Sequence, residues 1–357
     1  MFDNRTKMAN LFASLFASLY AVVIAFGFQF FDPIQRVLGR YTFVENSPNR
    51  YVDRYVPSVL TTKASNNKTI LVFIHGGGWH SGDKDDKFFV GSAFLGRELA
   101  SRGIHTILMT YPRSKLPLPA IALILCATMG LPLLLGALLS CIMFSFDVWL
   151  HVMIPLGVGL SLMIYFREIR TAGSEPADIS AQVDTICTNL QQLRSQGLVS
   201  LGDRFVLAGH SAGGHLATMV ALRNISTGNT LPIAKVIGIS GVYDIVSLYT
   251  RVESIVRPFV KYFCLDPTFG TLTDLTQFSP QQLVSQMNRG FVGSAVLPWF
   301  TLISAGCDHP ELIRQADAFA KILEPRCIQH KNVGFGHGLG LISCEKLISI
   351  LENSCNE

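Results

Sequence analysis

The chain has 357 residues, enough for one large α/β domain with additional segments. Only 15% of its residues are charged, whereas soluble domains carry about 25%. The net charge of +4 is modest, and no basic cluster with interleaved aromatic residues occurs, so nothing favours nucleic-acid binding. The eight cysteines show no C-x-x-C pair and no metal-like spacing, so we expect free thiols, no metal and no cofactor.

The shortage of charge is concentrated in two apolar runs. Residues 11–31 contain no charged side chain and have the length of one membrane helix, although a signal peptide is an alternative. Residues 116–166 contain one acidic residue, Asp147, and fit two membrane helices with Asp147 at their turn; a buried helix pair or an apolar lid is the alternative. The predicted organisation is an N-terminal membrane anchor (1–31), a first part of the catalytic domain (32–115), an inserted transmembrane hairpin (116–166) and a second part of the catalytic domain (167–357).

Basic residues indicate how the predicted hairpin is oriented. Arg113 and Lys115 precede it, Arg167 and Arg170 follow it, and its turn has no Lys or Arg. The positive-inside bias then leaves the catalytic domain facing the cytosol. We therefore expect a multi-pass protein of the endoplasmic reticulum or another endomembrane, with the lipid bilayer as a partner. The sequence gives no indication of oligomeric state.

Outside these runs, strands alternate with helices, which predicts a doubly wound, mostly parallel sheet. The predicted order is strand 70–75, helix 86–101, strand 104–110, the inserted run, helix 177–196, strand 204–208, a helix, strand 235–240, a long irregular cap segment, strand 299–305, helix 310–323, strand 326–333 and a last helix.

Three consecutive glycines follow the first of these strands, in the sequence His75-Gly76-Gly77-Gly78-Trp79. Consecutive glycines let backbone N–H groups point at one position, as an oxyanion hole requires. We predict oxyanion donors at Gly77 and Gly78, with Ala212 as the third. We also expect four residues to line the substrate site: His75, Gly76, Trp79 and His210. The alternative is an ordinary glycine turn in which Trp79 only packs.

The candidate nucleophile is Ser211, within Gly209-His210-Ser211-Ala212-Gly213. This G-x-S-x-G pattern lies between a predicted strand and a predicted helix, the setting of a nucleophile elbow, where the serine hydroxyl is pushed out of the sheet. Gly209 and Gly213 would let strand and helix approach closely. The alternative is a glycine-rich turn without catalytic function.

A serine nucleophile of this kind requires an acid and then a histidine later in the chain. Asp308 follows the end of a predicted strand, and His337 lies in a glycine-rich loop before the last helix. We predict that Asp308 orients the His337 imidazole and that His337 acts as the base.

Other histidines and one other aspartate compete for these functions. His309 adjoins the acid, His330 falls within or at the end of a strand, and His210 and His215 flank the serine in sequence. Asp244 also follows a strand and is an alternative acid, although capping the next helix is the simpler function for it.

Several motifs together resemble the α/β-hydrolase carboxylesterases, and among these most closely the isoprenylcysteine α-carbonyl methylesterases. The motifs are residues 75–79, 95–104, 111–113, 209–216, 239–244 and 278–280. The resemblance implies an α/β-hydrolase fold, with Ser211, Asp308 and His337 as nucleophile, acid and base. It also implies demethylation of prenylcysteine methyl esters, so a prenylated or acylated ester is the expected substrate. The chain departs from the family pattern in two places. An apolar run follows Lys115, and Pro112 stands between a tyrosine and an arginine that are usually adjacent in the family.

Three other functions fit the same sequence. An acyl or lipid ester hydrolase resembling the arylacetamide deacetylases usually has Asp where this chain has His210, and it faces the lumen. An arylformamidase-like amidase is the second. The third is an inactive hydrolase fold that serves as a membrane scaffold.

Overall fold

The computed structural model describes residues 41–45, 47–57, 68–84, 92–115, 177–228, 230–251, 260–270, 275–287, 297–334, 337 and 339–357. The predicted anchor (1–31) and the predicted hairpin (116–166) lie outside these ranges. No helix within them is long and apolar enough to cross a membrane.

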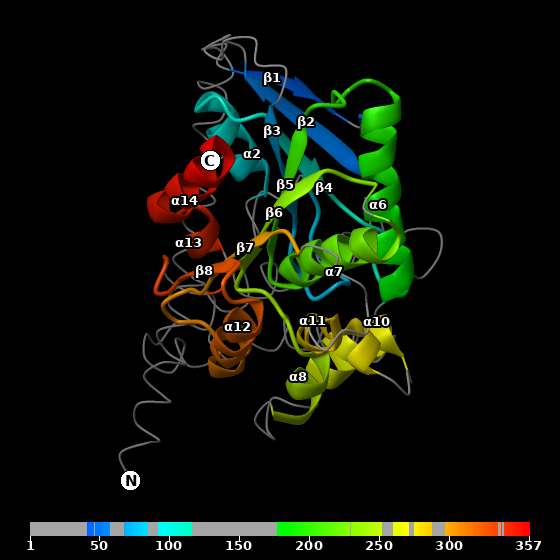
Figure 1. The fold of residues 1–357 in the computed structure, drawn as a ribbon, viewed down its shortest axis with the longest axis vertical. Coiled ribbons are helices and arrows are strands. Elements are labelled where there is room, and N and C mark those ends of the chain that lie inside the picture. Colours follow the sequence, from blue (N-terminus) through cyan, green and yellow to red (C-terminus); the bar gives the residue numbers. More distant parts are fainter. Residues whose placement is uncertain are drawn as a thin grey trace, which may run out of the picture.

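Eight strands form one sheet, in the order β1-β2-β4-β3-β5-β6-β7-β8 (Figure 1). Their bounds are β1 (Tyr41–Val44), β2 (Val52–Pro57), β3 (Thr69–Ile74), β4 (Thr106–Met109), β5 (Arg204–His210), β6 (Ile233–Ile239), β7 (Trp299–Ile303) and β8 (Cys327–His330). The six strands β3 to β8 pair with their neighbours in parallel, whereas β1 and β2 form an antiparallel extension beside β4. The predicted mostly parallel sheet is confirmed.

The strand order changes direction between β3 and β5. The chain runs from β3 outward to β4 and then returns to place β5 on the other side of β3. In open parallel sheets, such a switch point opens a crevice at the carboxyl ends of the strands. The loops that follow β3 and β5 therefore start side by side, and these are the glycine loop and the Ser211 turn.

Two layers of helices cover the sheet. The helices beside the sheet are α2 (Ser92–Ser101), α6 (Ile179–Ser195), α7 (Ala212–Ser226), α12 (Pro310–Leu323), α13 (Leu339–Ile342) and α14 (Glu345–Asn356). Figure 1 shows α2, α13 and α14 on one side and α6 and α7 on the other. Side chains of β3 alternate between the two cores: Ile70, Val72 and Ile74 face the core of α6 and α7, while Leu71 and Phe73 face that of α2 and α14.

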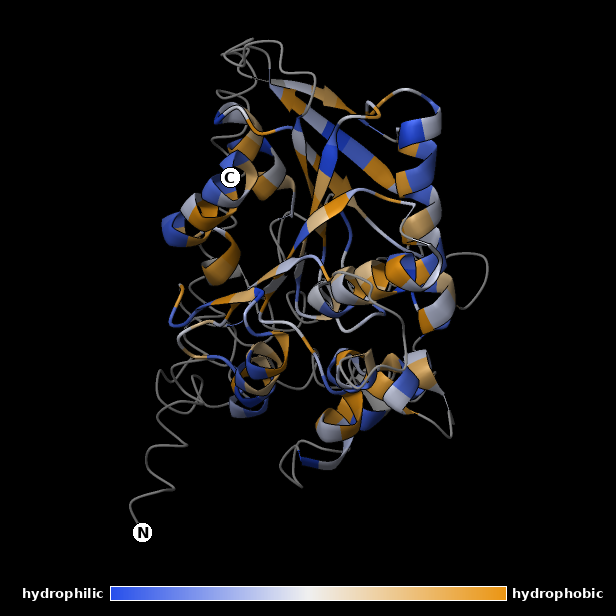
Figure 2. Cartoon of the chain, viewed as in Figure 1, coloured by the Kyte–Doolittle hydropathy of each residue, from blue (hydrophilic) through white to orange (hydrophobic). Residues whose placement is uncertain are grey.

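The predicted apolar face of α6 is confirmed by its burial. Its buried apolar residues are Ile179, Val183, Ile186, Leu190 and Leu193. Asp178 begins the helix as an N-cap, because its carboxylate accepts a hydrogen bond from the Ala181 N–H at 2.8 Å. Burial of each such side chain stabilises the fold by about 1.5–3 kcal/mol. Figure 2 shows hydrophilic residues interleaved with hydrophobic ones along α6 and α14, as expected of helices on the outside of a sheet.

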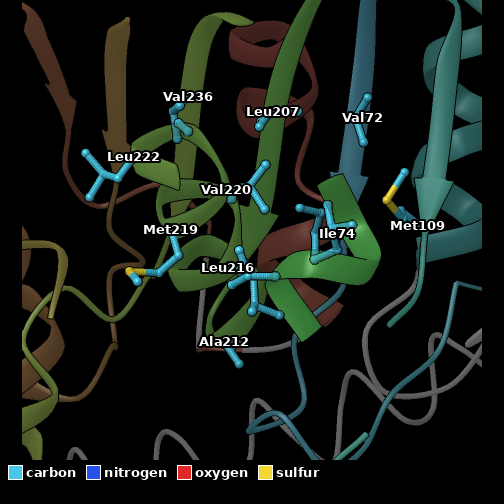
Figure 3. Close-up of a cluster of buried hydrophobic side chains, with 14 of the residues drawn as sticks. Val72, Ile74, Met109, Leu207, Ala212, Leu216, Met219, Val220, Leu222 and Val236 are labelled. Carbon is cyan, nitrogen blue, oxygen red and sulfur yellow. The ribbon is translucent and has the colours of Figure 1, made fainter. Parts of the chain in front are cut away.

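Helix α7, which follows Ser211, is buried on nearly all sides. Its first turns contribute Ala212, Leu216 and Val220 to the core, next to Ile74 of β3 and Leu207 of β5 (Figure 3). The helix also contacts α6 and α11 (Pro280–Gln286). The helix that follows Ser211 is consequently held in the core of the domain, between the sheet, α6 and α11.

The segment predicted to be an irregular cap instead contains several short helices. They are α8 (Ile245–Arg251), η2 (Val260–Leu265), α10 (Asp266–Phe269), η3 (Leu275–Phe278) and α11. These helices are only 4 to 7 residues long, too short for a clear 3.6-residue period in the sequence.

Candidate active site

Ser211 occupies a strained turn between β5 and α7. Its φ of 54° and ψ of −119° lie where a side chain is disfavoured, so the surrounding structure must hold it there. Its N–H donates to the Ile239 carbonyl oxygen at 2.8 Å, which extends the β5–β6 pairing by one bond. This geometry is the predicted strand-turn-helix arrangement.

The two glycines of the turn, Gly209 and Gly213, are required by backbone contact. A Cβ added to Gly209 would lie 2.1 Å from the Gly213 carbonyl oxygen. A Cβ added to Gly213 would lie 2.1 Å from the Ile74 carbonyl oxygen of β3. Neither backbone atom can move away as a flexible side chain would, which confirms the predicted close approach of strand and helix.

His337 joins Ser211 to Asp308 by two hydrogen bonds. Its Nε2 lies 2.9 Å from Ser211 Oγ, and its Nδ1 lies 2.7 Å from Asp308 Oδ1. With Nδ1–H donating to the carboxylate, Nε2 is left to accept from the serine hydroxyl. The Asp308 side chain is 1% exposed and that of His337 is 40% exposed. The three side chains, far apart in sequence, therefore meet at the carboxyl ends of the parallel strands.

The surroundings of Asp308 favour its ionised form. Burial alone raises the pKa of this carboxyl, but hydrogen bonds from His337 and the His309 N–H, together with the charge of His337 and the nearby Ser240 hydroxyl, bring the pKa below its usual value. The His309 N–H donates to Asp308 Oδ1 at 3.0 Å. Ser240 comes directly after β6 and has a φ of 48°. The sequence reasoning missed Ser240 as a neighbour of the acid, since a serine at a strand end gives no specific signal.

The glycine loop lies directly against the serine. A Cβ added to Gly76 would be 3.1 Å from Ser211 Cβ. Gly77 and Gly78 have φ values of 119° and 60°, and the Gly77 carbonyl accepts from the Ser81 N–H at 2.9 Å. Positive φ turns the peptide planes at these residues, and only glycine tolerates the contact of Gly77 with the Ser81 backbone. Among the described residues, no acceptor is found for the N–H groups of Gly77 and Gly78.

His75 and Trp79, two of the predicted substrate-site residues, are buried within the protein. The His75 ring stacks on Tyr111, its Nδ1–H donates to the Gly76 carbonyl at 2.7 Å, and its Nε2 pairs with Thr110 Oγ1 at 2.8 Å. Trp79 donates its indole N–H to His215 Nδ1 at 3.2 Å and packs edge-on against Phe269. These contacts make both residues supports of the glycine loop.

His210, the remaining predicted substrate-site side chain, also points into the protein. Its Nε2 lies 2.6 Å from the His337 carbonyl oxygen, and its ring centroid lies 4.9 Å from that of His337. Burial, together with the nearby His337 charge, lowers the pKa of His210 to about 3, so the ring is neutral near neutral pH.

The competing residues have other partners. Asp244 accepts a hydrogen bond from the Ser247 N–H at 2.9 Å, which confirms the predicted cap of α8. His215 lies between Trp79 and the Phe278 carbonyl oxygen, and His309 caps α12 by accepting from the Glu311 N–H. His330 is the last residue of β8, as expected.

A buried ion pair supports the chain just beyond the glycine loop. Lys84 Nζ lies 3.0 Å from Asp53 Oδ2 of β2, and the two side chains are only 8% and 2% exposed. Arg113, also buried, donates to the Gly82 carbonyl at 2.8 Å. The sequence gives no local sign of these pairings, because the partners are separated by about thirty residues and belong to different elements.

The part of the chain that the structure describes holds no group of three or more His, Cys, Asp or Glu side chains placed to bind a metal.

A parallel sheet with helices on both faces, and a serine at a strand-to-helix turn beside a histidine and a carboxylate, define the α/β-hydrolase class. The chain belongs to the alpha/beta hydrolase family, whose sequence profile matches residues 71–331. No curated protein matches it in sequence. The predicted relation to isoprenylcysteine methylesterases, a narrower group, stays a prediction.

Solved esterases share this fold. Inhibited esterase B from Lactobacillus rhamnosis is similar with a TM-score of 0.55 and 17% identity, over 95% of this chain and 97% of that one. One of two fungal esterases from Rhizomucor miehei gives 0.52 and 14% identity, over 88% and 82%. Esterase Est22 gives 0.53 and 15% identity, over 88% and 79%. At these identities the similarity is one of fold.

Proposed function

We propose that this protein is a serine hydrolase of carboxylic esters. The observation that carries the proposal is the hydrogen-bonded series Ser211–His337–Asp308, with contacts of 2.9 and 2.7 Å, at the turn where a hydrolase of this fold presents its nucleophile. In the proposed reaction, His337 Nε2 takes the proton of the Ser211 hydroxyl as Oγ attacks the ester carbonyl. Asp308 keeps the proton on Nδ1 and stabilises the imidazolium that forms.

The negative charge of the tetrahedral intermediate is assigned to the glycine loop. The N–H groups of Gly77, Gly78 and Ala212 are the proposed donors, and the contact of Gly76 with Ser211 supports this placement. Loss of one such donor lowers the rate about 10²- to 10³-fold in well-studied cases. His337 then protonates the leaving alcohol, and the acyl group remains on Ser211. Water activated by His337 releases the acid and restores the serine.

The proposed substrate is a prenylcysteine methyl ester presented at a bilayer. Its first support is the resemblance of the motifs to isoprenylcysteine methylesterases. The second is where the apolar run attaches to the domain: the Ser114 N–H donates to the Trp79 carbonyl at 3.1 Å, so the chain leaves the domain beside the glycine loop. If residues 1–31 and 116–166 lie in the membrane, this attachment holds the glycine-loop side of the site near its surface.

A fluorophosphonate probe tests the proposed chemistry with the full-length protein purified in detergent. We expect the wild type to be labelled and Ser211→Ala to remain unlabelled, with both showing the same thermal unfolding profile. An unlabelled wild type would instead favour an inactive scaffold.

Substrate choice is tested by comparing a prenylcysteine methyl ester with short-chain acyl esters and an arylformamide. We expect the highest kcat/KM on the methyl ester. Deletion of residues 116–166 should lower turnover of the ester in lipid vesicles while turnover of a water-soluble ester persists. Equal turnover in vesicles before and after the deletion contradicts the bilayer part of the proposal. A glycan on Asn67, which starts the glycosylation pattern Asn67-Lys68-Thr69, would contradict the cytosolic orientation.

A further inference from the structure

The His210 ring lies between the glycine loop and the backbone of His337. Neither of its ring nitrogens bonds to the serine hydroxyl. His210 is the last residue of β5 and is followed directly by Ser211. The residue is 4% exposed. Its Nε2 lies 2.6 Å from the His337 carbonyl oxygen. Because a carbonyl can accept but not donate a hydrogen bond, Nε2 must carry the ring hydrogen.

The opposite edge of the His210 ring packs against the glycine loop. A Cβ added to Gly76 would lie 2.7 Å from His210 Nδ1, which leaves no room for any side chain there. Nδ1 is buried and has no hydrogen-bond partner among the described residues. The ring thus fills the space between the glycine loop and the backbone of His337.

The neutral state of His210 fits this location. The titratable groups around it are His337, His75 and Asp308. Burial and the charges of His337 and His75 lower the pKa of His210 to about 3, although Asp308 and the hydrogen bond to the His337 carbonyl act in the opposite direction. A neutral ring keeps its single N–H on Nε2 for the His337 carbonyl. It also adds no positive charge next to an imidazolium on His337, 4.9 Å away between ring centroids.

We propose that His210 is a positioning residue that fixes the backbone of the base relative to the nucleophile. Its Nε2–H bond ties the His337 carbonyl to β5, the strand that ends directly before Ser211. Its ring sets the distance between the glycine loop and the backbone of His337. This inference rests on the proposed serine hydrolase function. A displacement of about 1 Å between reacting groups can lower a rate about 10²-fold, so a single bond of this kind has a measurable effect.

Two substitutions separate the hydrogen bond from the bulk of the ring. His210→Leu removes the donor and keeps an apolar side chain, whereas His210→Gln retains an N–H at a similar reach. We expect His210→Leu to lower kcat about 10²-fold with KM within twofold, and His210→Gln to recover at least tenfold of that loss. His330→Leu, the same change at the end of β8, is the matched control and should stay within twofold of the wild type.

The rate of fluorophosphonate labelling at Ser211 gives the second readout. A wild type that is not labelled would refute the proposed function. Labelling of wild type and His210→Leu at equal rates would leave that function intact and overturn the positioning inference, as would a folded His210→Gln no more active than His210→Leu. If His210→Leu does not fold, a folded His210→Gln decides: activity within tenfold of the wild type supports the inference, and a 10²-fold loss overturns it.

Discussion

Ser211 and His337 meet across 2.9 Å, yet the protein holds them in different ways. The Ser211 turn is fixed by backbone packed on backbone: Gly209 against Gly213, and Gly213 against Ile74 of β3. His337 is fixed by hydrogen bonds of 2.7 and 2.6 Å with Asp308 and His210, residues from distant parts of the chain. The difference shows why one half of the site leaves a motif in the sequence and the other leaves isolated residues.

The largest expected effect comes from removing the charge that orients the base. Asp308→Asn keeps the shape of the carboxylate but offers His337 Nδ1 an amide N–H, which favours the wrong tautomer. We expect kcat to fall about 10⁴-fold, as in serine hydrolases of the same chemistry. Steady-state hydrolysis of a soluble ester, with circular dichroism to verify folding, measures this. A variant that keeps a tenth of the wild-type activity would exclude Asp308 as the acid.

The backbone contacts that fix the Ser211 turn predict a large loss of stability when a side chain is added there. Gly213→Ala places a Cβ 2.1 Å from the Ile74 carbonyl oxygen, so strand and helix must separate. We expect the free energy of unfolding to fall by about 3 kcal/mol or more. Gly197→Ala is the matched control: Gly197 has a φ of 68° but open space around it, so only the backbone strain of about 1–2 kcal/mol applies. Denaturant titration measures both, and similar losses would show that packing at the turn is unimportant.

Buried and partly buried histidines make the stability of the domain depend on pH. Burial lowers the pKa of His80, His105 and His215 to about 4 and that of His210 to about 3, whereas an unfolded histidine has a pKa of about 6.5. Between these values the unfolded chain binds protons that the folded protein does not. The free energy of unfolding should therefore fall as pH falls below about 6.5, by up to about 1.4 kcal/mol per pH unit for each histidine.

Removing one of these histidines tests the assignment. His215→Gln should lower the slope of unfolding free energy against pH by up to about 1.4 kcal/mol per unit between pH 6 and pH 5. Slopes are compared, because loss of the contacts with Trp79 and Phe278 also lowers the absolute stability. Asp308, with its lowered pKa, contributes only below about pH 4 and does not interfere. Identical slopes would mean that His215 titrates normally in the folded protein.

The smallest effect is expected at the other candidate acid. Asp244→Ala removes the bond from the Ser247 N–H and should destabilise the fold by about 1 kcal/mol. Because Asp244 makes no contact with His337 among the described hydrogen bonds, kcat should stay within about threefold of the wild type, less than 1 kcal/mol in the barrier. Thermal unfolding and ester hydrolysis measure the two quantities. A 10³-fold loss of kcat would reverse the assignments of Asp244 and Asp308.

Much of the fold could be predicted because its signals are local. The strands β3 to β8 are apolar runs followed by turns, and Gly209 and Gly213 are needed for steric reasons that act within a few residues. The pair β1 and β2 was missed: β1 has only 4 residues, and β2 carries Asp53, a charge that is buried because Lys84 pairs with it. A partner so far along the chain cannot be inferred from one sequence.

The same limit applies within the site. Asp308 and His337 could be proposed from their places after predicted strands and from the chain order that a serine hydrolase requires. The burial of His75 and Trp79 could not, since a glycine-rich motif does not say which neighbouring side chains turn inward. The contact of His210 with His337 was missed for a related reason. His210 ends β5 and His337 lies in the loop after β8, so no regular spacing in the sequence links them.

Ser114 and Ala177, which flank the apolar run, meet directly: the Ser114 hydroxyl donates to the Ala177 carbonyl at 2.9 Å, and Gln182 donates to the same hydroxyl. The intervening residues 115–176 thus start and finish at one point of the domain. Because the entropy of closing a loop grows by only about 0.6 kcal/mol for each doubling of its length, such a junction accepts segments of very different size. Relatives of this protein can therefore gain, exchange or lose a whole segment here during evolution while the hydrolase domain keeps its own architecture.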